Sequence, residues 1–189
     1  DLKTTQTTST TTAPTGTFTL GDANCEAMGG SWSGSTCTLD QNYTLSAGDT
    51  LTIPAGITLL IKDTLTNDGT INNNSVINND GTINNKGTIT NNKILNNFDI
   101  LINSGIITNN DTIDNLNIIT NDGTINNVGK LNNVGTIENN DFITIAGSGT
   151  LNNNAGGTIN NNSIIDGDVL HLHRILDYGT INNDGVINN

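Results

Sequence analysis

The chain has 189 residues, and its 18 acidic and 6 basic side chains give a formal net charge of −12. So acidic a chain has no cluster of Lys and Arg to displace counterions from phosphates, which excludes nucleic acids and anionic membranes as partners. No apolar run approaches the roughly 20 residues that a helix needs to span a bilayer, so we expect no membrane span. Aromatic residues make up only 3% of the sequence, so any core must be built from regularly placed aliphatic side chains.

The N-terminal segment, residues 1–20, is rich in Thr and has no apolar pattern of its own. Thr favours extended backbone, so we expect this segment to be extended and prone to form a strand. Two interpretations remain open for it. It is either a flexible or O-glycosylated stalk, or a strand that is donated to a neighbouring subunit.

The next segment, residues 21–38, contains the two cysteines of the chain, Cys25 and Cys37. A single pair of cysteines in an acidic, Lys-poor chain indicates a disulfide, since neither the spacing nor the neighbouring residues suit a metal site. We therefore predict an N-terminal cap that is closed by a Cys25–Cys37 disulfide, with Trp32 packed beside the bond.

A six-residue repeat dominates the rest of the chain. Every sixth residue from Ile53 to Ile143 is Ile or Leu, and Asn keeps the same step from Asn67 to Asn139. This period suits a short strand followed by a corner, and three such units close a triangular coil of about 18 residues. The sequence therefore predicts an all-β fold, a parallel β-helix (β-solenoid) over residues 39–189, with Asn side chains stacked in three inward columns.

The rhythm changes at both ends of this region. Leu39, Leu45 and Leu51 keep the six-residue step in a different phase, which we interpret as first coils with longer strands. After Ile143 the spacing of the aliphatic residues becomes irregular, and we expect two-residue expansions at the corners there.

The repeat Gly81-Thr82-Ile83-Asn84-Asn85 carries a resemblance to known proteins. The chain resembles parallel β-helix proteins, and its Gly-Thr-Ile-Asn-Asn repeats are similar to those of prokaryotic, including archaeal, surface fibre and adhesin proteins. The resemblance implies an extracellular, secreted or cell-surface setting. Hexapeptide left-handed β-helices prefer a small residue four positions after the aliphatic one, where this chain also has Lys93 and Asp99, so the pattern leaves the handedness open.

One stretch departs from the repeat and contains both histidines, His171 and His173. On a strand their side chains project to the same side and could bind a metal together with Asp166 or Asp168. A locally modified coil or a subunit contact is the favoured interpretation, because the chain has no third His. No nucleophile–base pair or paired catalytic carboxylate stands out, so we expect neither enzymatic activity nor a cofactor.

Four Asn residues lie in the acceptor motif for N-glycosylation, which an extracellular protein can use. These candidate sites are Asn42, Asn73, Asn110 and Asn161.

The chain ends within a repeat, without a helix, Pro or charge cluster to close the last coil. An uncovered solenoid end invites another subunit, so we expect a homo-oligomer that joins head to tail, with Ile187 at the contact. Ile100, Ile102 and Ile118 should face outward on one face and form a lateral contact. The predicted function is a structural subunit of an extracellular filament or surface assembly, and the alternative is an adhesin or a module that binds surface glycans.

Overall fold

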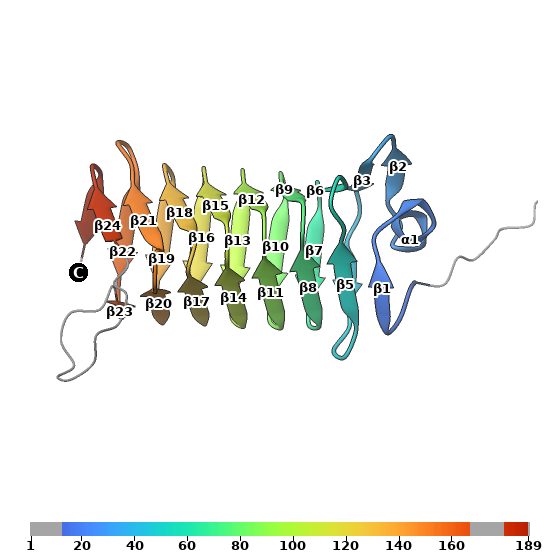
Figure 1. The fold of residues 1–189 in the computed structure, drawn as a ribbon, viewed down its shortest axis with the longest axis horizontal. Helices are drawn as coiled ribbons and strands as arrows, with labels where there is room; N and C mark the ends of the chain where they lie inside the picture. Colours follow the sequence, from blue (N-terminus) through green and yellow to red (C-terminus); the bar gives the residue numbers. More distant parts are fainter. Residues whose placement is uncertain (1–12, 167–179, 189) are drawn as a thin grey trace, which may run out of the picture.

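The computed structural model describes residues 13–166 and 180–188, which form a rod of stacked coils (Figure 1). Each coil contributes one short strand to each of three sheets, and the sheets run along the rod. Among the described strands, every neighbouring pair is parallel except the pair β2–β3 at the N-terminal end. The chain is a parallel β-solenoid, as the repeat predicts.

Each sheet takes its strands from successive coils, in order along the rod. The first sheet contains β1 (Thr17–Thr19), β5 (Thr50–Ile53), β8 (Thr70–Asn73), β11 (Thr88–Asn91), β14 (Ile106–Asn109), β17 (Thr124–Asn127), β20 (Phe142–Ile145) and β23 (Ile164–Asp166). The second sheet contains β2 (Ser31–Ser33), β3 (Thr36–Leu39), β6 (Thr58–Ile61), β9 (Val76–Asn79), β12 (Ile94–Asn97), β15 (Thr112–Asn115), β18 (Lys130–Asn133), β21 (Thr150–Asn153) and β24 (Thr180–Asn183). The third sheet contains β4 (Tyr43–Leu45), β7 (Thr64–Asn67), β10 (Thr82–Asn85), β13 (Ile100–Asn103), β16 (Ile118–Asn121), β19 (Thr136–Asn139), β22 (Thr158–Asn161) and β25 (Val186–Asn188).

Each repeat makes a four-residue strand in which the second and fourth side chains point into the coil. In β10, for example, Ile83 and Asn85 are buried, whereas Thr82 and Asn84 are partly exposed on the outer face. The next coil repeats this pattern in register, so that Ile83 pairs with Leu101 and Asn85 with Asn103. Alternation along a strand therefore builds the interior from one aliphatic and one amide side chain per repeat.

The buried Asn side chains form three continuous ladders, one behind each sheet. Asn85 Nδ2 donates to Asn103 Oδ1 at 2.7 Å, and Asn103 Nδ2 donates to Asn121 Oδ1 at 2.8 Å. The ladder amides also donate to backbone carbonyls, as Asn103 Nδ2 does to Gly105 O at the corner (3.3 Å) and to Thr124 O at the start of β17 (3.1 Å). The side-chain donors of the ladders all point toward the C-terminal end, so the ladders have a direction.

The ladders begin on aliphatic side chains. Leu45 lies in register with Asn67, and Ile61 with Asn79. As a result, the Oδ1 atoms of Asn67 and Asn79 are buried without a hydrogen-bond partner. The inward-pointing fourth position of the strands therefore changes from an aliphatic side chain to Asn between one coil and the next.

The prediction of longer strands in the first coils is wrong. The strands there have three or four residues like the others, and the extra residues form four-residue corners at 46–49 and 54–57. Gly48 and Gly56 turn these corners with φ of 88° and 84°, a backbone conformation that favours Gly. The expected expansions after Ile143 are confirmed, since residues 146–149 and 154–157 form similar corners.

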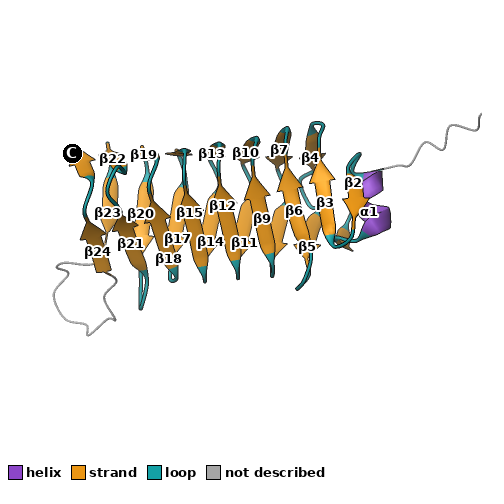
Figure 2. Ribbon diagram, turned by 90° about the horizontal axis from the view of Figure 1, so that it is seen from above, coloured by secondary structure: helices purple, strands orange, loops and turns teal. Residues whose placement is uncertain are grey.

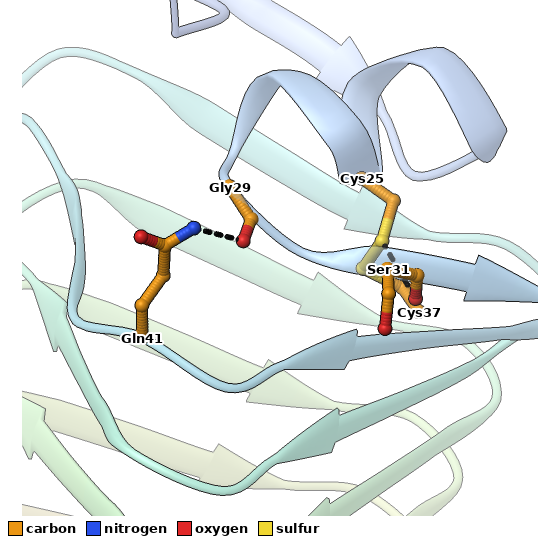
Figure 3. The surroundings of a disulfide bond; sticks show 5 residues. All are labelled: Cys25, Gly29, Ser31, Cys37 and Gln41. Atoms are coloured by element: carbon orange, nitrogen blue, oxygen red, sulfur yellow. Dashed lines mark hydrogen bonds between the residues drawn. A yellow bond between two sulfur atoms is a disulfide. The ribbon is translucent and has the colours of Figure 1, made fainter.

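The N-terminal end of the rod carries a small cap. Helix α1 (Asp22–Ala27) places Cys25 against β3, where it forms the predicted disulfide with Cys37 (Figure 3). Trp32 pairs with Cys37 across the hairpin β2–β3 and packs against the core. The side chain of Gln41 donates a hydrogen bond to Gly29 O and ties the turn after the helix to the first coil.

The structure describes only the second part of the Thr-rich segment, residues 13–20. Residues 1–12 lie outside the described residues, whereas Thr17–Thr19 form β1, which pairs with β5 of the same chain. Phe18 points inward there. For these residues neither the stalk nor the donated strand holds, because they pair within their own chain and Phe18 and Leu20 are buried in its core.

Reducing the Cys25–Cys37 disulfide should loosen the cap and leave the coils folded. Loop-closure entropy for a bond spanning 12 residues corresponds to about 3 kcal/mol, and solenoid coils depend mainly on their neighbours, so the effect should stay local. Limited proteolysis with and without reductant measures it, with new cleavage expected in residues 21–42. Equal acceleration of cleavage around β12 would contradict a local effect.

Candidate functional site

We call the C-terminal side of the described coils the open end, because no further coil follows there among the described residues. The strands β23, β24 and β25 are the last of their sheets, so their outer edges have no partner strand among the described residues. Four aliphatic side chains and one amide line a pocket of about 190 Å³ at this end: Leu151, Ile165, Ile181, Ile187 and Asn161. Ile181 is 40% exposed although it occupies an inward position, in register with Leu151. The predicted contact residue Ile187 thus lies in an apolar opening of the core.

A helix covers the core at the N-terminal end, where β1, β2 and β4 are the last strands of their sheets. In both ribbon views helix α1 lies beyond the first coil (Figures 1 and 2), where Cys25 and Met28 are buried under it. The side chains that α1 exposes include Asp22 and Glu26. The two ends of the rod therefore differ: a helix with exposed carboxylates covers one, and the other exposes aliphatic side chains of the core beside Asn161.

The structure places the predicted lateral residues on the outer face of the third sheet, and we call them the face patch. Ile100 pairs with Ile118 on the next coil, and Ile102 lies two residues further along β13. Ile118 is 36% exposed, while Ile100 and Ile102 are only partly exposed. The neighbouring strands carry Thr82 and Thr136 in the same row, so the patch is short.

A second apolar surface follows the corner between the second and third sheets, and sequence reasoning missed it. Phe98, Leu116 and Val134 occupy the same corner position on three successive coils and are 44%, 48% and 50% exposed. We call these three residues the corner strip. A groove of about 430 Å³ runs along it, lined on its other side by Asn96, Asp114 and Asn132.

The polar side of this groove is ordered by hydrogen bonds between coils. Asn132 Nδ2 donates to Asp114 Oδ1 at 2.7 Å, and Asn96 Nδ2 donates to Asn78 Oδ1 at 2.9 Å. The groove thus combines a row of half-exposed apolar side chains with a parallel row of amides and one carboxylate. The 18-residue spacing of Phe98, Leu116 and Val134 is the signal in the sequence that could have revealed the strip.

One predicted glycosylation site is wrong. Asn73 belongs to an inward ladder, is fully buried, and donates through Nδ2 to Asn91 Oδ1 at 2.7 Å and to Ile94 O at 2.8 Å. In the folded protein this nitrogen cannot carry a sugar. The acceptor motif coincides with the repeat at this position, and the repeat determines where the side chain lies.

The other three candidate sites lie nearer the surface. Asn42 and Asn110 are exposed, and Asn161 is partly exposed on β22. Asn110 Nδ2 donates to Asn92 Oδ1 at 2.8 Å, and Asn161 Nδ2 donates to Ser163 O at 3.0 Å. Glycosylation of these side chains stays a prediction.

The candidate metal ligands His171, His173 and Asp168 lie outside the described residues. Within residues 13–166 and 180–188, no group of three or more His, Cys, Asp or Glu side chains is arranged to hold a metal ion. In the same part of the chain, no helix has the length and apolar character needed to cross a membrane.

Comparison with known proteins gives no relative for this chain. No protein family, no curated protein and no solved structure matches it. The function must therefore be inferred from the rod, its two ends and its outer surfaces.

Proposed function

We propose that the chain is a structural subunit of an extracellular filament or surface assembly, in which copies join head to tail. The observation that carries the proposal is the open end of the rod. Ile165, Ile181 and Ile187 line a mainly aliphatic pocket there together with Asn161, beside three strand edges that have no partner in the described residues. Exposed parallel edges with an apolar interior favour the addition of further strands.

The two unequal ends favour one mode of joining. Direct stacking of coil on coil would bring helix α1, which carries the exposed Asp22 and Glu26, against the pocket at the open end. This arrangement would bury carboxylates without partners, which is unfavourable. The Thr-rich residues that precede β1 are the better joining element, because Thr is well suited to a strand added to a free sheet edge.

The disulfide supports an extracellular setting. Cys25 and Cys37 are bonded in the N-terminal cap, and such bonds persist in oxidising compartments. An excess of acidic side chains would keep free subunits dispersed until salt screens their repulsion. Both the disulfide and the excess of acidic side chains are therefore compatible with a surface assembly that forms outside the cell.

Electron microscopy of negatively stained protein tests the proposal. Purified protein at physiological salt should form fibres whose length increases with protein concentration. Analytical ultracentrifugation of the same samples should detect species that grow with concentration. Monodisperse single rods at all concentrations would contradict the proposal and favour the alternative, a surface module that binds glycans.

A further inference from the structure

The flank of the rod carries a feature that head-to-tail joining does not use, the corner strip of Phe98, Leu116 and Val134. Each side chain lies on a different coil, so neighbouring members are separated along the axis by the spacing between strands, about 4.8 Å. All three are close to half exposed, and a groove runs beside them. An occupant of this surface must match both the axial spacing and the shape.

An extended peptide does not match the strip. Side chains on one face of a strand repeat about every 6.6 Å, so a peptide lying along the axis would fall out of step after one contact. A second rod of the same chain has the same axial spacing as the strip itself. Apolar side chains of two such rods can therefore interdigitate at every coil, as they do between paired sheets in a steric zipper.

The order of the three residues is also self-complementary. A twofold axis through Leu116 and perpendicular to the rod places Leu116 against Leu116 of a second copy. The same axis places Phe98, the largest of the three, against Val134, the smallest. At each outer position a large side chain thus meets a small one, and at the centre two equal side chains meet. Such pairing fills the space evenly in an isologous contact, in which both copies use the same surface.

We infer that the corner strip is a lateral contact through which two copies of the chain pair side by side, antiparallel, about a twofold axis at Leu116. Three half-exposed side chains offer far less than the roughly 800 Å² per partner that a stable interface buries, so a single pair is weak. Covalent trapping can therefore measure the single pair, and repetition along a filament would only add to it. This contact lies on the flank of the rod and is independent of what the open end binds.

The charge of the surroundings sets the conditions for pairing. Asp114 lines the groove, and each copy carries a net charge of −12, so two rods repel each other at low ionic strength. Salt screens this repulsion and strengthens apolar contact. Lateral pairing should therefore increase with salt, the opposite of a contact held by ion pairs.

Disulfide trapping tests the inference. Both native cysteines are bonded to each other, so one introduced Cys is the sole free thiol. Under mild oxidation Leu116→Cys should form covalent dimers, about tenfold or more faster than a Cys at an unpaired surface position, because pairing raises the effective thiol concentration. Val128→Cys is the matched control, since Val128 is 41% exposed at a different corner.

Cysteines at the two outer positions of the corner strip, residues 98 and 134, test whether the paired rods are antiparallel. In the antiparallel pair, two copies of residue 98 lie two coil spacings apart, about 10 Å, beyond the Cα separation that a disulfide tolerates. Phe98→Cys alone and Val134→Cys alone should therefore dimerise slowly, whereas an equimolar mixture of the two variants should give mixed dimers. Rapid self-dimerisation of Phe98→Cys would indicate parallel rods and overturn the twofold arrangement.

The experiment is best done in an Ile181→Asp background, in which the open end carries a charge. Pairing there is measured without fibres, so a failure of lateral pairing and a failure of head-to-tail joining give different results. Equal rates for Leu116→Cys and Val128→Cys would overturn the inference. So would protection of the thiol in Leu116→Cys by an added polysaccharide without dimer formation, since that result would make the groove a glycan site.

Discussion

Replacing Asn103 by Asp should destabilise the folded protein by about 3–5 kcal/mol at pH 7, the range seen when a buried charge loses its partner. Asn103 is fully buried, accepts from Asn85 Nδ2 and donates to Asn121 Oδ1. A carboxylate at this position loses both donor hydrogens and faces the carbonyl oxygens of Gly105 and Thr124. Denaturant unfolding of the variant and the parent measures the difference.

The effect should depend on pH in a defined direction. Burial among oxygen atoms raises the pKa of the new carboxyl in the folded state above its unfolded value of about 4. Below that unfolded value both states are protonated, and the protonated group can still donate one hydrogen bond, so the destabilisation is smallest there. It grows as pH rises above about 4 and becomes constant above the folded-state pKa.

Asn84→Asp is the matched control, because Asn84 lies on the outer face of β10. The outer row of the second sheet already contains Asp114 between Asn96 and Asn132, so a carboxylate is tolerated on an outer face. We expect Asn84→Asp to change stability little at any pH. Equal effects of the two variants would mean that the ladders do not stabilise the coils.

Replacing Ile181 by Asp should abolish fibre formation while the rod stays folded. Ile181 lines the apolar pocket at the open end and is 40% exposed, so a carboxylate there remains hydrated in the free subunit. Burying the same carboxylate under an incoming strand is costly. Circular dichroism should retain the β signal, and electron microscopy should find single rods.

Val186→Asp provides the control for this prediction. Val186 belongs to β25 at the same end and is 52% exposed, but it occupies an outward position, in register with Thr158. A charge there should leave fibres intact. Fibres of parental length from Ile181→Asp would exclude the pocket as the joining surface.

The interior of the rod could be predicted from the sequence because every repeat places the same two residue types inward. Ile83 and Asn85 obey the rule that Leu101 and Asn103 obey one coil later. The rule also predicts the outward direction of Ile100. Helix α1 gives no such signal, since six residues are too few for a period and its position depends on burying Cys25 and Met28.

The corners are harder to predict for a related reason. A corner residue adds no side chain to the aliphatic interior, so the six-residue period that marks the inward positions does not fix its identity. The four-residue corners at 46–49 and 54–57 depend on the backbone of Gly48 and Gly56, and spacing alone does not distinguish them from longer strands. Phe98, Leu116 and Val134 lie at two-residue corners, outside the inward positions that the aliphatic repeat marks.

The direction of the hydrogen bonds between coils has a mechanical consequence. Both the backbone bonds between strands and the Asn ladders run along the rod, so a pull on its two ends loads them in series. The weakest boundary then opens first, and one coil peels off at a time. Each coil advances the rod by about 4.8 Å but releases roughly 60 Å of extended chain. A fibre of such rods would respond to overload by lengthening in steps rather than by breaking.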